Sequence, residues 1–155
     1  MTHATGRLTV ALATASDIPA LADLLALLFA QEAEFAPDRP AQYRGLGLII
    51  ENPTLGHLLV AHAGEQAVGM VGLLYTVSTA LGARVALLED MVVAPAHRGA
   101  GVGAYLLAQA IAHARAQGCA RVTLLTDEIN AGAQRFYARH GFTRSPMLPL
   151  RLLLA

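Results

Sequence analysis

A cluster of glycines near residue 100 is the feature of the chain with the clearest chemical meaning. Residues 98–103 read Arg-Gly-Ala-Gly-Val-Gly, between an apolar stretch and a segment whose apolar residues have helical spacing. Glycines at alternate positions let main-chain N–H groups turn toward one point, and they let a ligand approach without a Cβ in the way. The start of the following helix adds roughly half a positive charge. The segment therefore predicts a site for a pyrophosphate, with the charge of Arg98 beside it.

The same glycines allow other interpretations. They could form only a tight strand-to-helix connection, or they could belong to a dinucleotide-binding fingerprint. That fingerprint requires a parallel βαβ unit and an acidic residue near the end of the next strand, where Asp127 and Glu128 are the candidates. The predicted loop instead follows an antiparallel meander, so the fingerprint fits less well. A P-loop is excluded because the chain contains no Gly-Lys-Ser/Thr sequence.

The elements before this loop follow from hydrophobic periodicity and turn residues. A first strand is expected over residues 7–13. Ser16 or Asp17 is the expected N-cap of a helix that runs to about Phe29. A polar loop is expected over 31–44. A second short helix is expected around 41–51, so its start overlaps the end of that loop. Three antiparallel strands are then expected at 57–63, 67–78 and 84–93, because glycine-rich turns separate them.

After residue 100 the pattern changes to helical spacing. We expect a helix from Val102 to a cap at Gly118, a strand over 121–126, and a helix between Asn130 and Gly141. Strands are expected from Phe142 onward and over 148–154. This order predicts a single α/β domain, residues 1–155, with a mixed sheet and helices packed on its faces.

Composition narrows the class of protein. Eleven basic and eleven acidic residues give a formal net charge of zero, which offers no basic excess to a nucleic-acid backbone. Although 55% of the residues are hydrophobic, no apolar run approaches the roughly 18 residues that cross a bilayer. The single cysteine, Cys119, excludes an internal disulfide and is expected to be a bystander. We expect no nucleic-acid partner, no membrane partner and a cytoplasmic location.

Several motifs in order resemble the GNAT family of N-acetyltransferases. The family pattern Arg/Gln-x-x-Gly-x-Gly/Ala is met by Arg98, Gly101 and Gly103. An Asn near the start of the next helix, an aromatic-Tyr pair within it and Gly-Phe at its end are matched at Asn130, 136–137 and 141–142. The resemblance extends over nearly the whole chain. It implies an acetyl-CoA-dependent enzyme with a sheet of about six or seven strands, in which an antiparallel meander is followed by a splayed parallel pair, flanked by about four helices.

The resemblance also implies roles for individual residues. Strand residues 91–93 would pair with the pantetheine arm of acetyl-CoA, and main-chain amides near Val92 would polarise the thioester carbonyl. The loop would hold the pyrophosphate, and Tyr137 would protonate the leaving thiolate. The implied cofactor-binding residues are Met91, Val92, Val93, Arg98, Gly99, Ala100, Gly101, Val102, Gly103, Ala104, Asn130, Ala133 and Tyr137.

Each polar residue has a simpler structural alternative. Tyr137 could be a core aromatic, and Asn130 could be only a helix N-cap. Glu89 and Asp90 are adjacent charges in an apolar strand and should face opposite sides unless a bulge intervenes. The family often places a catalytic glutamate in this strand, so Glu89 is our predicted general base, acting directly or through water. A structural salt bridge to an arginine is the alternative.

The histidines show no metal-ligand spacing, so no metal is predicted. His57 and His62 share neither a helix face nor a carboxylate partner at ligand spacing, and His97 is expected to be solvated. His113 and His140 are interpreted as solvent-facing helix residues.

The acceptor is not identified by the sequence. Leu88-Glu89-Asp90 before the glycines resembles the polyamine and thialysine branch of the family, and Glu32, Glu34 and Asp38 could add carboxylates for a cationic substrate. A small-molecule primary amine is the expected acceptor. A non-catalytic acyl-CoA sensor and another nucleotide-binding module are the rival hypotheses, and a homodimer is expected from the family likeness and the apolar residues 148–154.

Overall fold

The computed structural model describes residues 7–31 and 36–155. The chain divides into two compact units, Met1–Leu125 and Thr126–Ala155. Glu32 and Glu34, proposed above as substrate carboxylates, lie outside the described residues. None of the helices in the described ranges is long and apolar enough to span a bilayer.

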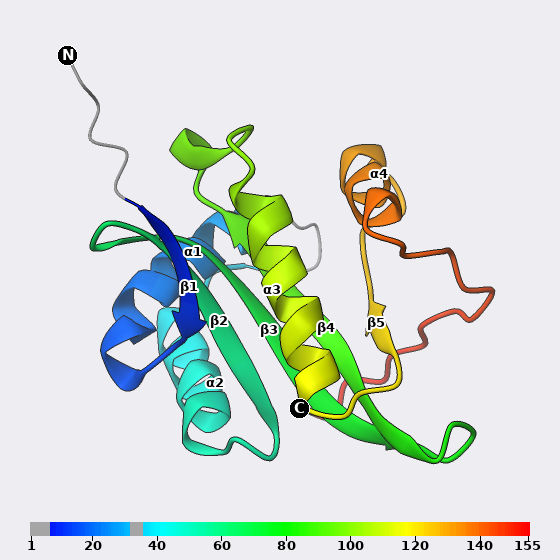
Figure 1. Ribbon diagram of the computed structural model, residues 1–155. Helices are drawn as coiled ribbons and strands as arrows, with labels where there is room; N and C mark the ends of the chain where they lie inside the picture. The colour runs from blue at the N-terminus through cyan, green and yellow to red at the C-terminus, as the bar shows by residue number, and fades with distance from the viewer. Residues whose placement is uncertain (1–6, 32–35) are drawn as a thin grey trace. The chain divides into compact units, whose positions relative to one another are not determined.

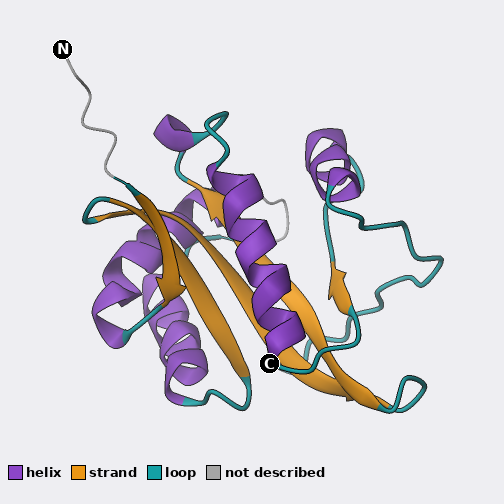
Figure 2. Cartoon of the chain, viewed as in Figure 1, coloured by secondary structure: helices purple, strands orange, loops and turns teal. Residues whose placement is uncertain are grey.

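The N-terminal unit is built on one twisted sheet in which neighbours along the chain are neighbours in space (Figures 1 and 2). The first four strands pair antiparallel, and the fourth and fifth pair parallel. The predicted meander and parallel pair are therefore confirmed. The strands are β1 (Leu8–Leu12), β2 (Gly56–Ala63), β3 (Gln66–Ser78), β4 (Ala83–Val93) and β5 (Val122–Leu124).

Helices cover both faces of this sheet. Figure 1 shows α1 (Ile18–Gln31) and α2 (Arg39–Glu51) behind the sheet and α3 (Val102–Ala116) in front of it. Two short 3-10 turns, Ala15–Asp17 and Pro95–His97, precede α1 and the glycine loop. This three-layer arrangement buries both faces of the central strands, which explains why β3 and β4 read as nearly continuous apolar runs.

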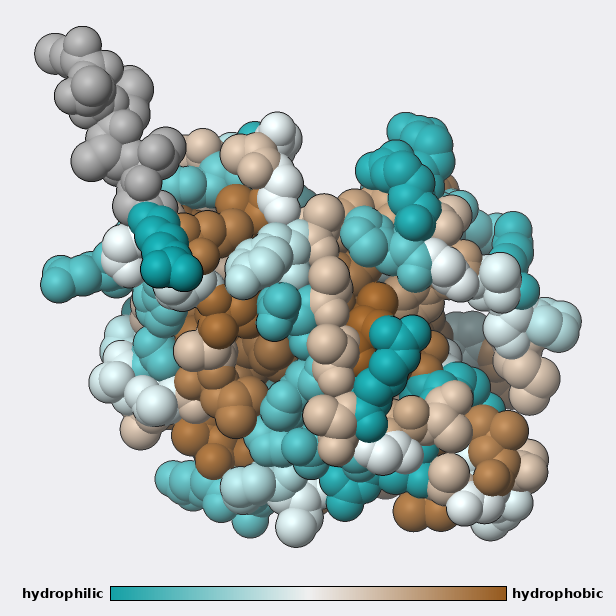
Figure 3. Space-filling model, in the orientation of Figure 1, coloured by the Kyte–Doolittle hydropathy of each residue, from teal (hydrophilic) through white to brown (hydrophobic). Residues whose placement is uncertain are grey.

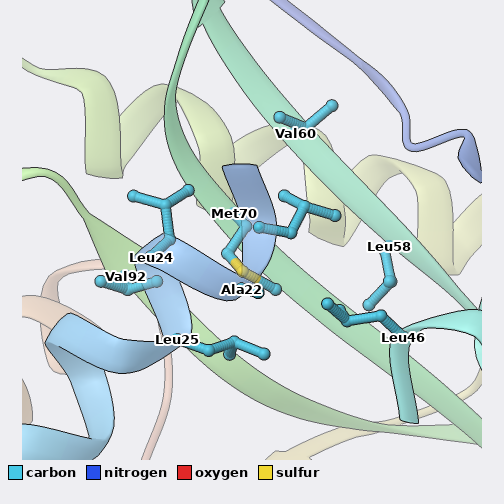
Figure 4. Close-up of a cluster of buried hydrophobic side chains, with 9 residues drawn as sticks. Ala22, Leu24, Leu25, Leu46, Leu58, Val60, Met70 and Val92 are labelled. Atoms are coloured by element: carbon cyan, nitrogen blue, oxygen red, sulfur yellow. The ribbon is translucent and has the colours of Figure 1, made fainter. Parts of the chain in front are cut away.

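A cluster of buried side chains holds α1 and α2 against the sheet (Figure 4). Leu21, Leu24 and Leu25 recur at helical spacing in α1 and are at most 4% exposed. They pack with Leu46 of α2 and with Met70 of β3, which is fully buried. Burial of side chains of this size contributes about 1.5–3 kcal/mol each, so the amphipathic stripe predicted for α1 is what fixes the helix to the sheet.

The helix starts differ from the sequence prediction. Thr14 is the N-cap of the 3-10 turn Ala15–Asp17 that leads directly into α1, and its N–H donates to Asp17 Oδ2 at 2.8 Å, so the helical segment starts before the predicted caps Ser16 and Asp17. The polar segment expected to be a loop is shorter, because α2 already begins at Arg39. Asp38 caps α2 by accepting from the Ala41 amide at 3.2 Å. An aspartate N-cap followed by a proline in the first turn is a favoured helix start.

The C-terminal unit contains α4 (Ala131–Arg139), followed by a segment without regular secondary structure. Asn130 caps the helix, and Gly141 follows it with φ of +93°, as the sequence predicts. The strands predicted from Phe142 onward and over 148–154 are absent from the described residues, so the sheet has five strands and not six or seven. Pro146 and Pro149 interrupt this segment, and proline has no N–H to donate to a strand partner.

Candidate acetyl-CoA site

A bulge interrupts β4 where the sequence places two adjacent carboxylates. Glu89 pairs with Gly72 of β3 and Val92 pairs with Met70, so two residues of β4 face one residue of β3. One of the two is Asp90, whose φ of +56° is the only positive value at a non-glycine residue in the described ranges. Aspartate tolerates this left-handed conformation better than most residues do. The bulge therefore re-aims the main chain that follows it.

The strand continues past the end of its parallel neighbour. β5 pairs with β4 only from Ala86 to Leu88, and β4 then runs on to Val93. The Ala94 amide donates to Val68 of β3 at 2.8 Å. Because N–H groups alternate between the two edges of a strand, the amides of Met91 and Val93 point away from β3. The amide of Val92 points toward β3.

Glu89 lies on the side of the sheet that α1 and α2 cover. Its partner Gly72 faces that side, because a Cβ on Gly72 would lie 3.2 Å from the side chain of Leu58. Leu58 belongs to the buried cluster that packs α1 and α2 against the sheet. Directly opposed residues of an antiparallel pair share a face. Glu89 is exposed, and no ion pair of its carboxylate occurs in the described ranges, so the predicted alternative of a salt bridge finds no support.

Arg98 ties the glycine loop to the end of β4. Its Nε donates to the main-chain carbonyl of Val93 at 3.1 Å. The same alternation that turns the Val93 amide away from β3 places this carbonyl on the same edge. The side chain of Arg98 is therefore held on the edge of β4 where the amides of Met91 and Val93 point.

Two glycines shape the loop. Gly99 has φ of +76° and Gly101 has φ of +82°, and no atom lies within 4 Å of a Cβ built at either position. Gly101 is also the N-cap of α3, and it makes no side-chain cap that would occupy the first amides of the helix. The first four N–H groups of a helix have no intrahelical acceptor. An open loop that leads to such amides has the geometry of an anion site.

Asn130, Ala133 and Tyr137 belong to the C-terminal unit. The Asn130 Oδ1 accepts from the Ala133 amide at 3.0 Å, so the predicted N-cap role is confirmed and this amide is already bonded. The ring of Tyr137 lies edge-to-face with those of Phe136 and Phe142, with centroids 5.2 and 5.7 Å away. Burial raises the pKa of Tyr137, so its phenol stays protonated at neutral pH.

The surroundings of four histidines differ from what the sequence predicts. His113 is half-buried and contacts His57 on β2, so the prediction that it faces solvent is wrong. The same prediction is wrong for His140, which is half-buried and whose ring centre lies 4.8 Å from that of Phe136. His62 lies 3.6 Å from the Asp17 carboxylate. His57 and His113 are brought together from separate elements, so their spacing along the chain carries no signal.

Fold and site together define an α/β domain with a glycine loop at a helix start, which has the geometry of an anion site. The chain belongs to the acetyltransferase (GNAT) family, whose family model matches residues 20–142. A crystal structure of an integron cassette protein from the mobile metagenome of Cole Harbour Salt Marsh is 28% identical, with a TM-score of 0.82 over 94% of this chain and 90% of that chain. The fold and family expected from the sequence are therefore confirmed.

Curated relatives match shorter stretches. Mycothiol acetyltransferase of Streptosporangium roseum is 46% identical over 50 residues, which make up 32% of this chain and 15% of that protein. N-acetyltransferase 8B of Rattus norvegicus is 35% identical over 86 residues, or 56% of this chain and 39% of that protein. The chain thus spans well under half the length of these two relatives.

Proposed function

We propose that this protein is an acetyl-CoA-dependent N-acetyltransferase whose acceptor is a small primary amine. The observation that carries the proposal is the loop before α3, in which the left-handed Gly99 and Gly101 leave open space beside the first amides of the helix. Coenzyme A carries a pyrophosphate, and such a loop suits two linked phosphates. Membership of the GNAT family supports the same cofactor.

The cofactor arm is assigned to the exposed edge of β4. An extended pantetheine can pair with a strand edge as an added strand does, and the amides of Met91 and Val93 point to that edge. Asn130 uses its Oδ1 for the helix cap, so we assign its side-chain NH2 to the arm. Ala133 has no free amide for the cofactor, because its N–H is bonded in the cap, and we assign it a van der Waals contact.

The proposed chemistry is direct transfer. Glu89 accepts a proton from the acceptor ammonium, directly or through one water, and the resulting amine attacks the thioester carbonyl carbon. A β4 amide stabilises the negative charge that develops on the carbonyl oxygen, and the alternation along the strand favours Met91 or Val93 for this role over Val92. The C–S bond breaks, and Tyr137 donates its phenolic proton to the departing thiolate. The nitrogen of the new amide gives up its second proton, which restores the Tyr137 phenol through solvent, and Glu89 releases its proton to solvent.

Two measurements test the proposal. Purified protein is titrated with acetyl-CoA, NAD and ATP in thermal unfolding, where a ligand at about 100 times its Kd stabilises by about 2.7 kcal/mol. Protection by acetyl-CoA alone is expected, and protection by NAD or ATP instead would identify another nucleotide module. Release of free CoA is then followed with a panel of polyamines, amino acids, aminoglycosides and peptide N-termini. Binding without turnover on any amine would identify a sensor instead of an enzyme.

We also propose a homodimer. The C-terminal unit carries six apolar side chains that are between 79% and 95% exposed: Met147, Leu148, Leu150, Leu152, Leu153 and Leu154. Exposed apolar side chains that follow closely along the chain suit a contact surface, and a second copy of the chain is the partner that we propose. Light scattering of the wild type should give twice the chain mass, and Leu150→Glu with Leu152→Glu should give the monomer mass. A wild-type monomer at micromolar concentration contradicts the dimer.

A further inference from the structure

Three side chains converge between the sheet and α3, away from the glycine loop. His57 of β2, Tyr75 of β3 and His113 of α3 belong to separate elements of the N-terminal unit. The Nδ1 of His57 lies 2.6 Å from the Tyr75 hydroxyl and 3.1 Å from Nε2 of His113. The two imidazole rings meet at 87° with centroids 4.7 Å apart. The proposed acetyl transfer uses none of these groups.

Hydrogen bonding does not fully account for this arrangement. A ring nitrogen of neutral imidazole has one position in the ring plane, either a proton or a lone pair. The Nδ1 of His57 faces two partners, so one proton or one lone pair must be shared between both. The Nδ1 of His57 thus has a second imidazole nitrogen and a phenolic oxygen within 3.1 Å, and all three atoms are of types that bind transition-metal cations.

The nitrogen separation fits a shared metal ion. Zinc binds imidazole nitrogen at about 2.0–2.1 Å with tetrahedral angles, which places two such nitrogens about 3.4 Å apart. The observed separation of 3.1 Å between His57 Nδ1 and His113 Nε2 needs a few tenths of an ångström of movement, and the phenolic oxygen of Tyr75, 2.6 Å from Nδ1, must move away by about 0.7 Å to bind the same ion. In the described part of the chain, no group of three or more His, Cys, Asp or Glu side chains is arranged to hold a metal. The third ligand here would be the phenol of Tyr75.

The surroundings favour neutral rings that solvent can reach. Burial lowers the pKa of both His57 and His113, and neutral imidazole is the form that binds metals. His113 also lines an open groove of about 240 Å³ between α3 and the first two strands, beside Val10 and Leu59. Figure 3 shows the mostly apolar surface over β1 and β2 next to α3. The groove gives solvent access to the side chain of His113.

One positive charge opposes a cation at this point. The guanidinium of Arg84 lies 4.9 Å from the centre of the Tyr75 ring. A hard cation such as Mg²⁺, which binds through oxygen and keeps its waters, has little to gain there. A borderline cation that bonds strongly to imidazole can bind despite this charge, and affinity for nitrogen sites rises toward Cu²⁺ and Zn²⁺.

We propose that His57, His113 and Tyr75 form a binding site for a zinc- or copper-type dication, which clamps the C-terminal half of α3 to the sheet. His57 binds through Nδ1 and His113 through Nε2. Burial raises the pKa of Tyr75 to about 12, so its phenol is protonated before the ion arrives. Coordination of the phenolate oxygen then releases that one proton to solvent. The proposal is independent of acetyl transfer.

The test uses full-length protein without a histidine tag. Calorimetry with ZnSO4 and with CuSO4 should show one saturable ion per chain, and the ion should raise the thermal unfolding temperature. Electron paramagnetic resonance of the copper form should show hyperfine coupling to two nitrogens. Tyr75→Phe should remove a phenolate-to-copper charge-transfer band while both nitrogens remain. His113→Gln should weaken binding at least tenfold, and Arg84→Gln should tighten it.

Matched variants separate this site from other histidines. His140→Gln and His62→Gln each remove one ring elsewhere, and both should bind as the wild type does. His113→Gln folding is checked by its unfolding transition without metal. Equal binding by wild type and His113→Gln would overturn the proposal. Loss of binding in His62→Gln would also overturn it, because it would assign the ion to His62 and Asp17, which lie 3.6 Å apart.

Discussion

The Nε of Arg98 donates to the carbonyl oxygen of Val93, 3.1 Å away, and so joins the glycine loop to the end of β4. This one bond links the segment proposed to hold pyrophosphate to the strand edge proposed to hold pantetheine. The guanidinium has further N–H groups that can meet an anion. Arg98 therefore has a positioning role and an electrostatic role in the same side chain.

Substitution of Arg98 separates these two roles. Arg98→Lys keeps the charge but loses the Nε donor in its fixed plane, while Arg98→Ala loses both. Hydrogen bonds to charged groups are worth about 1.5–3 kcal/mol, so Arg98→Ala should weaken acetyl-CoA binding by about ten- to a hundredfold, with Arg98→Lys between it and the wild type. Calorimetry measures both. Equal affinity of all three proteins would contradict the proposed site.

Gly101→Val tests the left-handed cap of α3. A β-branched residue at φ of +82° should cost about 1–2 kcal/mol of folding free energy and remove protection by acetyl-CoA. Gly47→Ala is the control, because Gly47 lies inside α2 with open space around it and no positive φ. That change should stabilise the fold by about 0.4–1 kcal/mol and leave binding intact. Denaturant unfolding with and without acetyl-CoA gives both quantities.

Tyr137→Phe tests the proton donor. The change should lower kcat strongly and leave the Kd for acetyl-CoA nearly unchanged, since only the transition-state interaction is lost. Burial raises the pKa of Tyr137 above its ordinary value of 10.0, so the donating form persists at pH 7–9 and disappears only as pH rises through the raised pKa. A fall in kcat centred near pH 8 would assign the acid to another group.

The same shift affects stability at high pH. The folded state disfavours the charged phenolate, so the contribution of Tyr137 is fully present below pH 10.0 and is lost as pH rises through the raised folded pKa. Tyr137→Phe should remove this alkaline loss. Comparison of the unfolding free energies of both proteins from pH 9 to pH 11 measures the difference.

Substitution of Asp90 tests the bulge. At φ of +56° glycine is unstrained, aspartate is tolerated and valine is strongly disfavoured. Asp90→Gly should keep the fold and cofactor binding, whereas Asp90→Val should lose about 1–2 kcal/mol of stability and disturb the amides of Met91 and Val93. Asparagine also tolerates the left-handed region, so the stability of Asp90→Asn should lie between those of the glycine and valine variants. If valine behaves like glycine, the bulge does not depend on residue 90.

Local patterns predicted most of the N-terminal unit. Three signals each involve residues close together in the chain: the apolar stripe of α1, the turns between the strands of the meander, and the glycines before α3. Their signals depend on backbone geometry and on one buried face. The same patterns failed at the C-terminus, where the leucines of 148–154 suggested a strand. Apolar alternation indicates a strand only when a partner strand accepts its hydrogen bonds, and no sequence window contains that partner.

The amino-acid sequence by itself determined the glycine loop, the helix start behind it and the family, because a left-handed turn and free helix amides follow from adjacent residue types. Tertiary structure alone decided which amides of β4 face outward, where the Asp90 bulge falls and that His57 meets His113. Strand register and helix packing set those relationships, and both arise from contacts between residues far apart in the chain.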